Sequence, residues 1–150
     1  MADRGVSAVL GYVLVLGIVT LLISGLFLAA GNFVENQHQR AVRAEFEVVG
    51  NRVAADIAAI DRLALASGPD GRAELEVNLP PLAAGKTYEI TTSSAGGNVS
   101  FVNVSTTDAS FDVAVEVRVK TDTTLAATTV SGGDVVIVYD GSQIEVREDA

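Results

Sequence analysis

An uncharged run over residues 5–34 constrains this chain more than any other feature of its sequence. It follows Asp3 and Arg4 directly, contains no proline, and consists mostly of Val, Leu, Ile, Ala and Gly. A helix needs roughly 20 apolar residues to cross a hydrocarbon core of ~30 Å. Residues 6–34 exceed that length, and we therefore expect them to form a membrane-spanning helix.

The run is too long for an ordinary secretory signal. Such a signal has a longer basic segment, an apolar stretch of about 7 to 15 residues and a small-residue cleavage site. The small residues Ala29, Ala30 and Gly31 match that cleavage pattern only weakly. We therefore expect the apolar helix to stay on the mature protein.

The residues after the run continue the helix with an apolar stripe. Large apolar side chains recur every three or four positions, which is the period of an amphipathic helix. No proline interrupts residues 6–68, and a glycine such as Gly50 costs a helix only about 1 kcal/mol relative to alanine. We predict one helix over residues 7–65, ~88 Å long at 1.5 Å per residue, which ends at the Gly- and Pro-containing residues 67–71. The stripe consists of Val42, Phe46, Val49, Val53, Ile57, Ile60 and either Leu63 or Ala64.

From residue 72 onward, apolar and polar residues alternate as they do in half-buried strands. Turn-forming residues separate the alternating segments, as in the Asp140 and Gly141 pair. The sequence predicts an antiparallel sheet of six or seven strands that is too small to bury a large core alone. We therefore predict an α+β fold in which the amphipathic part of the helix packs on this sheet. The predicted strands are residues 73–79, 87–92, 99–104, 111–119, 134–139 and 143–146, with a weaker one at 123–130.

The charge distribution indicates an acidic soluble domain. The chain has a net charge of −9, and residues 66–150 carry 13 acidic against 5 basic residues. An acidic, lysine-poor surface keeps a protein soluble by self-repulsion, which fits a halophilic source. It lacks the basic stripe that nucleic-acid binding needs. Cysteine is absent, which excludes disulfides and thiolate metal sites.

No residue pattern predicts catalysis. The sequence lacks a phosphate-binding loop, a G-x-S-x-G motif and an H-E-x-x-H motif. Glu74 and Glu76 share one face of a predicted strand, where we expect solvated side chains. Asp134 and Asp140 provide fewer oxygens than the six to eight that calcium takes. The single histidine, His38, follows the apolar run in a polar stretch. We expect no enzymatic activity, no cofactor and no metal.

The residues at the start of the apolar run carry a more specific signal. Residues 4–11 read Arg-Gly-Val-Ser-Ala-Val-Leu-Gly. They resemble the N-termini of archaeal type IV pilin-like proteins, particularly the haloarchaeal ones, which carry class III signal peptides. Ala8 stands where many relatives have proline, and Leu10 stands where bacterial pilins have an acidic residue.

In that family, a prepilin peptidase removes a short charged leader, and the apolar helix becomes the core of a filament. The resemblance implies cleavage between Gly5 and Val6, with Arg4 and Ser7 beside the cut. It divides the chain into a leader (1–5), a transmembrane and filament-core half of the helix (6–34), an amphipathic half (35–66) and an extracellular β-domain (72–149).

The resemblance also implies partners and modifications. The partners would be membrane lipid, the prepilin peptidase and other pilin-like subunits. Pairs of small residues spaced four apart let helices approach closely in lipid. Gly11, Ser24 and Gly25, each in such a pair, are candidates for an assembly face; the pairs are Ser7 with Gly11, Thr20 with Ser24, and Gly25 with Ala29. Archaeal surface filaments are commonly N-glycosylated, and Asn98 and Asn103 both begin N-x-[ST] triplets.

Two functions remain open on the residues alone. The first is a structural subunit of a type IV pilus-like filament or pseudopilus. The second is a single-pass envelope protein whose β-domain binds a partner without polymerising. A major pilin, a minor pilin, an adhesin and a secretion pseudopilin all fit the first.

The orientation in the membrane rests on conflicting signals. Lys and Arg tend to stay on the cytoplasmic side, and weighing Arg4 against Arg40 and Arg43 would place the β-domain inside the cell. The leader, the N-x-[ST] triplets and the cysteine-free acidic domain favour the outside. We expect the β-domain to be extracellular.

Overall fold

A long helix and a β-rich domain make up the protein. The computed structural model describes residues 2–68, 70–109 and 111–149, with side chains from Val9 onward except Asn32. Helix α1 (Ala2–Ser67) has no break, as predicted. Contacts divide the chain into two units, Met1–Gln39 and Arg40–Ala150, called here the N-terminal unit and the β unit.

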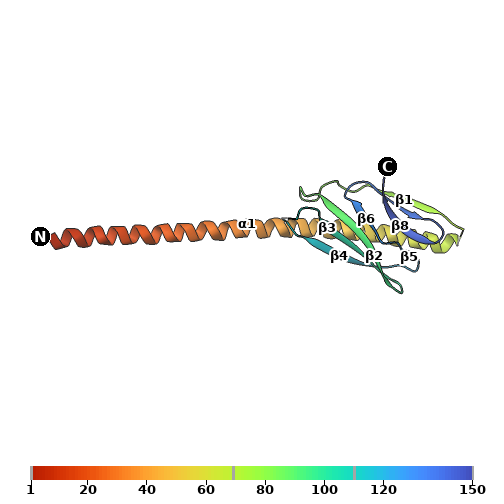
Figure 1. Ribbon diagram of the computed structural model, residues 1–150, viewed down its shortest axis with the longest axis horizontal. Helices are drawn as coiled ribbons and strands as arrows, with labels where there is room; N and C mark the ends of the chain where they lie inside the picture. Colours follow the sequence, from red (N-terminus) through yellow and green to blue (C-terminus); the bar gives the residue numbers. More distant parts are fainter. Residues whose placement is uncertain (1, 69, 110, 150) are drawn as a thin grey trace. The chain divides into compact units, whose positions relative to one another are not determined.

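Among the described residues, the β unit contains eight strands in two four-stranded sheets (Figure 1). One sheet has the order β1-β7-β8-β5 and the other has the order β4-β3-β2-β6. The strands are β1 (Ala73–Val77), β2 (Tyr88–Gly96), β3 (Val99–Thr106), β4 (Ala114–Lys120), β5 (Thr124–Leu125), β6 (Thr128–Ser131), β7 (Val135–Tyr139) and β8 (Gln143–Glu148).

The α+β fold class is confirmed, but the prediction of one antiparallel sheet was wrong. The strands form two sheets, and β5 pairs with β8 in parallel. The predicted strand over residues 123–130 is two short strands, β5 in one sheet and β6 in the other. Alternation reports which side of a strand is buried, but it carries no information about which strand lies beside it.

The predicted strand over residues 111–119 begins at Ala114 instead. Its apolar face is nevertheless as predicted, since Phe111, Val113 and Val119 are buried. A turn precedes the strand, in which the Phe111 N–H donates to the Asp108 carbonyl at 3.0 Å. The Thr106 hydroxyl donates to the Phe111 carbonyl in the same turn.

The stripe of α1 forms one side of the core of the β unit. Val42, Phe46, Val53 and Ile57 have no exposed surface at all. Of the two alternatives at its end, Ala64 is buried and Leu63 is exposed. Strand residues complete the core, so helix and sheets stabilise each other by burying apolar surface.

Gly50 lies on the helix close against two valine side chains of the second sheet. A Cβ atom at this position would lie 2.8 Å from Cγ2 of Val117 and 3.4 Å from Cγ2 of Val104. The sequence identified only the helix-propensity cost of this glycine. The structure gives a packing reason for it, because any larger residue would push β4 away from the helix.

We expect Gly50→Ala to lower the stability of the β unit by about 1 kcal/mol, since overpacking costs about 1–3 kcal/mol and helix propensity returns about 1 kcal/mol. Adding Val117→Ala should recover part of the loss by removing the crowded methyl group. Thermal unfolding of the detergent-solubilised full chain, followed by near-UV circular dichroism of its three tyrosines, measures both changes.

Ala55, exposed on the same helix, provides the control. Ala55→Gly changes helix propensity without any packing contact and should cost about 1 kcal/mol. A Gly50→Ala variant that gains as much stability as Ala55→Gly loses would show that packing does not select glycine here.

Candidate functional site

The apolar part of α1 is the most unusual surface of this protein. Every described side chain from Val9 to Val34 is exposed, and the exposed fractions of the large apolar ones run from 43% at Val19 to 74% at Phe27. Among the described residues this is one helix long and apolar enough to cross a membrane, with a mean hydropathy of 2.7 in its most apolar 18-residue window. Such a surface needs lipid or other apolar helices around it.

Two hydroxyl groups within this segment are satisfied by the helix itself. The Thr20 hydroxyl donates to the Leu16 carbonyl at 2.8 Å, and the Ser24 hydroxyl donates to the Thr20 carbonyl at 2.9 Å. A hydroxyl bonded in this way can face hydrocarbon without an unpaired donor. These two hydroxyl groups are therefore in a form that lipid tolerates.

The predicted assembly residues leave open space beside the helix. A Cβ atom at Gly11 or Gly25 would meet no atom within 4 Å. Ser24 is exposed, and its bond to the Thr20 carbonyl leaves the oxygen able to accept a further bond. The role of all three in assembly stays a prediction. The predicted processing residues Arg4, Gly5, Val6 and Ser7 have side chains outside the described part of the chain.

The two predicted glycosylation residues lie in different surroundings. Asn98 is exposed in the tight turn between β2 and β3, and its side-chain amide donates to the Asp122 carboxylate. Asn103 lies on the interior strand β3, where it is paired with Thr91 and Glu116 in the sheet register. Its Oδ1 atom is buried and has no hydrogen-bond partner within the described structure.

Asp140 organises the turn between β7 and β8. Its carboxylate accepts the backbone N–H groups of Ser142 at 2.8 Å and Gln143 at 3.0 Å, and the Ser142 hydroxyl at 2.8 Å. These bonds lower the pKa of Asp140 to about 2, with the Gln143 N–H contributing most. The group is therefore a carboxylate at neutral pH, with its bonds directed into the turn.

The polar residues elsewhere form no metal-binding cluster in the part of the chain that the structure describes. Glu74 and Glu76 are exposed on β1, as expected for solvated side chains. His38 is partly exposed on α1.

Comparison of the sequence with known protein families identifies the family of this chain. A family model described as a family of unknown function (DUF7266) matches residues 1–148. The chain belongs to the DUF7266 family. No curated protein and no solved structure matches it significantly.

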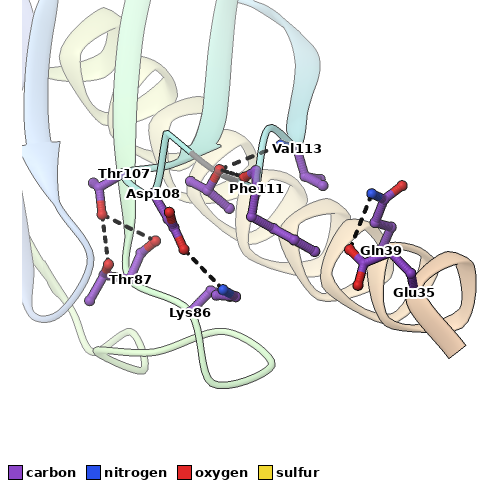
Figure 2. Close-up of polar contacts among 9 residues, drawn as sticks. Glu35, Gln39, Lys86, Thr87, Thr107, Asp108, Phe111 and Val113 are labelled. Atoms are coloured by element: carbon purple, nitrogen blue, oxygen red, sulfur yellow. Dashed lines mark hydrogen bonds and ion pairs between the residues drawn. The ribbon is translucent and has the colours of Figure 1, made fainter. Parts of the chain in front are cut away.

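One cluster in this DUF7266 protein holds two loops together, and the sequence did not reveal it. Lys86 Nζ lies 3.0 Å from Asp108 Oδ2 and 4.7 Å above the ring of Phe111 (Figure 2). The hydroxyls of Thr87 and Thr107 lie 2.6 Å apart beside it. The cluster joins the loop before β2 to the loop before β4. No local pattern could have paired residues some 20 positions apart.

Asp61 is a second residue that the sequence did not identify. It lies beside the stripe of α1 with 5% of its surface exposed. Its two carboxylate oxygens accept the backbone N–H groups of Asp122 at 3.0 Å and Thr123 at 2.8 Å. A charge next to an apolar stripe is the only signal that could have marked it. The carboxylate fixes the chain where β4 ends against the helix.

We expect Asp61→Asn to destabilise the DUF7266 β unit by about 1.5–3 kcal/mol, because hydrogen bonds to a charged group contribute that much and the amide offers one acceptor instead of two. Asp56→Asn, at a less buried position on the same helix, should change stability by less than about 0.5 kcal/mol. Denaturant unfolding of the full chain in detergent measures both. Equal effects of the two substitutions would contradict the anchoring role of Asp61.

Proposed function

We propose that this protein is a membrane-inserted structural subunit, similar to archaeal type IV pilins, that polymerises into a surface filament or pseudopilus. The observation that carries the proposal is the apolar segment from Val9 to Val34, whose described side chains are all exposed. Before assembly, lipid covers this apolar surface. In the filament, the apolar helices of neighbouring subunits cover it.

The continuity of α1 supports this proposal. The helix that provides the apolar segment also provides the core stripe of the β unit, from Val42 to Ala64. A helix that anchors a domain through a flexible linker would need no such stripe. Here the β unit buries part of the helix itself, so the apolar segment stays attached to a folded domain.

The N-terminal residues support processing rather than simple anchorage. Arg4, Gly5, Val6 and Ser7 resemble the cleavage site of class III signal peptides, which prepilin peptidase recognises. Cleavage would leave the apolar helix on the mature chain. The proposed location is the cell membrane with the β unit outside, followed by a surface filament that serves adhesion in a halophilic archaeon.

A groove in the β unit favours a second candidate, a single-pass envelope protein that binds a partner without polymerising. The groove has a volume of about 240 Å³ and is lined by five apolar residues and two charged ones, Val48, Val49, Leu79, Pro80, Ala83, Glu45 and Arg52. Val48 is 68% exposed there. Recovery of the protein in sheared surface fractions supports the filament. Retention of all of it in the membrane supports the second candidate.

We expect the chain isolated from native membranes to lack residues 1–5 and to begin at Val6, as N-terminal sequencing and intact mass would show. Gly5→Phe should leave the leader attached, because the residue before the cut is small in this family. Gly11→Phe provides the control, since it adds the same bulk beyond the cut. A mature chain that begins at Met1 or Ala2 would contradict the prepilin proposal.

For the glycosylation sites, we expect a glycan on Asn98 and none on Asn103. Asn98 lies exposed in a turn, whereas Asn103 lies on an interior strand that is paired on both sides, where the backbone is fixed and the side chain is only partly exposed. In the native host, Asn98→Gln should remove the glycan mass and Asn103→Gln should leave it, as glycopeptide mass spectrometry would show. A glycan on Asn103 alone would contradict this assignment.

A further inference from the structure

Strand β4 ends one sheet and presents an open backbone edge. The Thr106 N–H donates to the Val113 carbonyl at 3.0 Å, and the Thr121 N–H donates to the Asn98 carbonyl at 3.3 Å. In antiparallel pairs, residues that exchange bonds alternate with residues that do not. The odd-numbered residues of β4 therefore bond to β3. The backbone groups of Ala114, Glu116, Arg118 and Lys120 point away from the sheet.

Strand β1 ends the other sheet in the same way. The Asp140 N–H donates to the Gln143 carbonyl at 3.3 Å, and the Asp149 N–H donates to the Asp134 carbonyl at 3.1 Å. The even-numbered residues of β7 therefore bond to β8, and its odd-numbered residues bond to β1. By the register, the backbone groups of Glu74 and Glu76 point away from β7.

The second half of β4 and the edge strand β1 carry opposite charges on their exposed faces. Arg118 and Lys120 are exposed on β4, after the exposed Glu116, and Glu74 and Glu76 are exposed on β1. None of these five takes part in an ion pair of the described structure. Opposite charges directly across a strand pair stabilise it, and like charges destabilise it.

The inward faces of both edge strands are incompletely covered. Among the residues that the structure describes, six apolar ones are packed against the core while only partly buried, and four of these lie on the two edge strands. They are Ala73 and Leu75 on β1 and Val115 and Val117 on β4. An additional strand at either edge would extend the apolar layer over them.

The direction of β4 along α1 follows from contacts at its two ends. Thr106, at the end of β3, donates its N–H to the Val113 carbonyl beside the start of β4. It also pairs with Tyr88, whose ring lies 5.7 Å from that of Phe46. Asp122, just after β4, donates its N–H to Asp61. β4 therefore runs in the direction of the helix, from the level of Phe46 to that of Asp61.

β1 runs the opposite way. It begins at Ala73, shortly after α1 ends at Ser67. It is followed by Leu79, which lines the groove together with Val48 and Val49 of α1. An antiparallel pair of β4 in one copy with β1 in another therefore keeps the α1 helices of the two β units parallel.

We propose that β4 of one copy pairs antiparallel with β1 of the next copy of this chain. In the register in which the outward backbone groups of both strands bond to each other, Arg118 lies opposite Glu76 of the next copy, and Lys120 lies opposite Glu74. Val117 then faces Val77 of the next copy, and Val119 faces Leu75. This contact rests on the proposed function, because it supplies the subunit-to-subunit interface of the assembling β units.

The two symmetric pairings fit less well. Pairing β1 with a second β1 about Leu75 places Glu74 opposite Glu76, which is a like-charge pair. Pairing β4 with a second β4 about Val117 matches Glu116 with Arg118, but its two-fold axis reverses the helix direction. The α1 segments within the two β units would then run in opposite directions. The pairing of β4 with β1 uses different surfaces on the two copies and can propagate as an open chain.

Engineered cysteines test the contact, because the natural chain has no cysteine. Residues 118 and 76 of successive copies would be a hydrogen-bonded pair with Cα atoms about 5.5 Å apart, which is within disulfide range. The full-length chain carrying both Arg118→Cys and Glu76→Cys should form a disulfide-linked ladder of multimers in oxidised native membranes. Coexpression of the two single variants should give dimers only.

Two further cysteine pairs provide controls. Arg118→Cys with Glu145→Cys places the second cysteine on the central strand β8 and should give no ladder. Glu116→Cys with Arg118→Cys would cross-link a symmetric pairing of two β4 strands. A strong product from this last pair, or no ladder from the 118 and 76 pair, would overturn the proposal.

Charge reversal tests the same contact independently. In the chain without engineered cysteines, Arg118→Glu together with Lys120→Glu should weaken multimer formation by roughly fivefold for each reversed pair. The multimers are measured by photochemical cross-linking, which does not depend on lysine side chains. Glu74→Lys with Glu76→Lys should do the same. The four changes together should restore the multimers. Loss without restoration would overturn the proposed pairing, while unchanged thermal unfolding of each variant shows that it folds.

The outcomes for this contact and for the proposed function are separable. A chain that is cleaved at Gly5 and recovered in filaments, but forms no 118 and 76 ladder, contradicts the edge contact alone. A ladder from a chain that begins at Met1 and stays in the membrane supports the edge contact and contradicts the filament.

Discussion

The packing of the α1 stripe on both sheets is the interaction on which the β unit depends. Neither four-stranded sheet has enough apolar surface to form a stable domain alone. The helix contributes fully buried side chains such as Phe46, Ile57 and Ile60, and the strands close around them. Gly50 sets how closely the helix and β4 can approach. Asp61 fixes the end of that strand through two backbone bonds.

This packing also explains why one helix has two kinds of surface. Over the β unit, α1 buries one face and exposes the other, as an amphipathic helix does. From Val9 to Val34 it exposes apolar side chains all round, which water cannot solvate without cost. The satisfied hydroxyls of Thr20 and Ser24 suit the same apolar surroundings. The stripe of α1 is therefore apolar because it packs on its own domain. The segment from Val9 to Val34 is apolar because it suits lipid or other apolar helices around it.

Much of this fold could be predicted from the sequence because the signals are local. Periods of three to four and of two identified the helix, its buried stripe and the inward side of strands such as β4. The division into two sheets could not be predicted, because strand pairing is set by contacts between distant residues. The roles of Gly50 and Asp61 depend on partners more than 50 positions away. Among the candidate site residues, the apolar segment was predictable by length alone, whereas the open edges became visible only with the register.

The register also gives meaning to the few basic residues of an acidic domain. Residues 66–150 have only 5 Lys or Arg residues, and two of them occupy consecutive outward positions on β4. Strand β1, at the edge of the other sheet, places Glu74 and Glu76 at its outward positions. Charged edge strands normally prevent sheets from joining. The charges of β1 oppose its pairing with a second β1, because Glu74 would then lie opposite Glu76. They favour its pairing with β4, because Glu76 and Glu74 then lie opposite Arg118 and Lys120, in the direction that keeps the helices parallel.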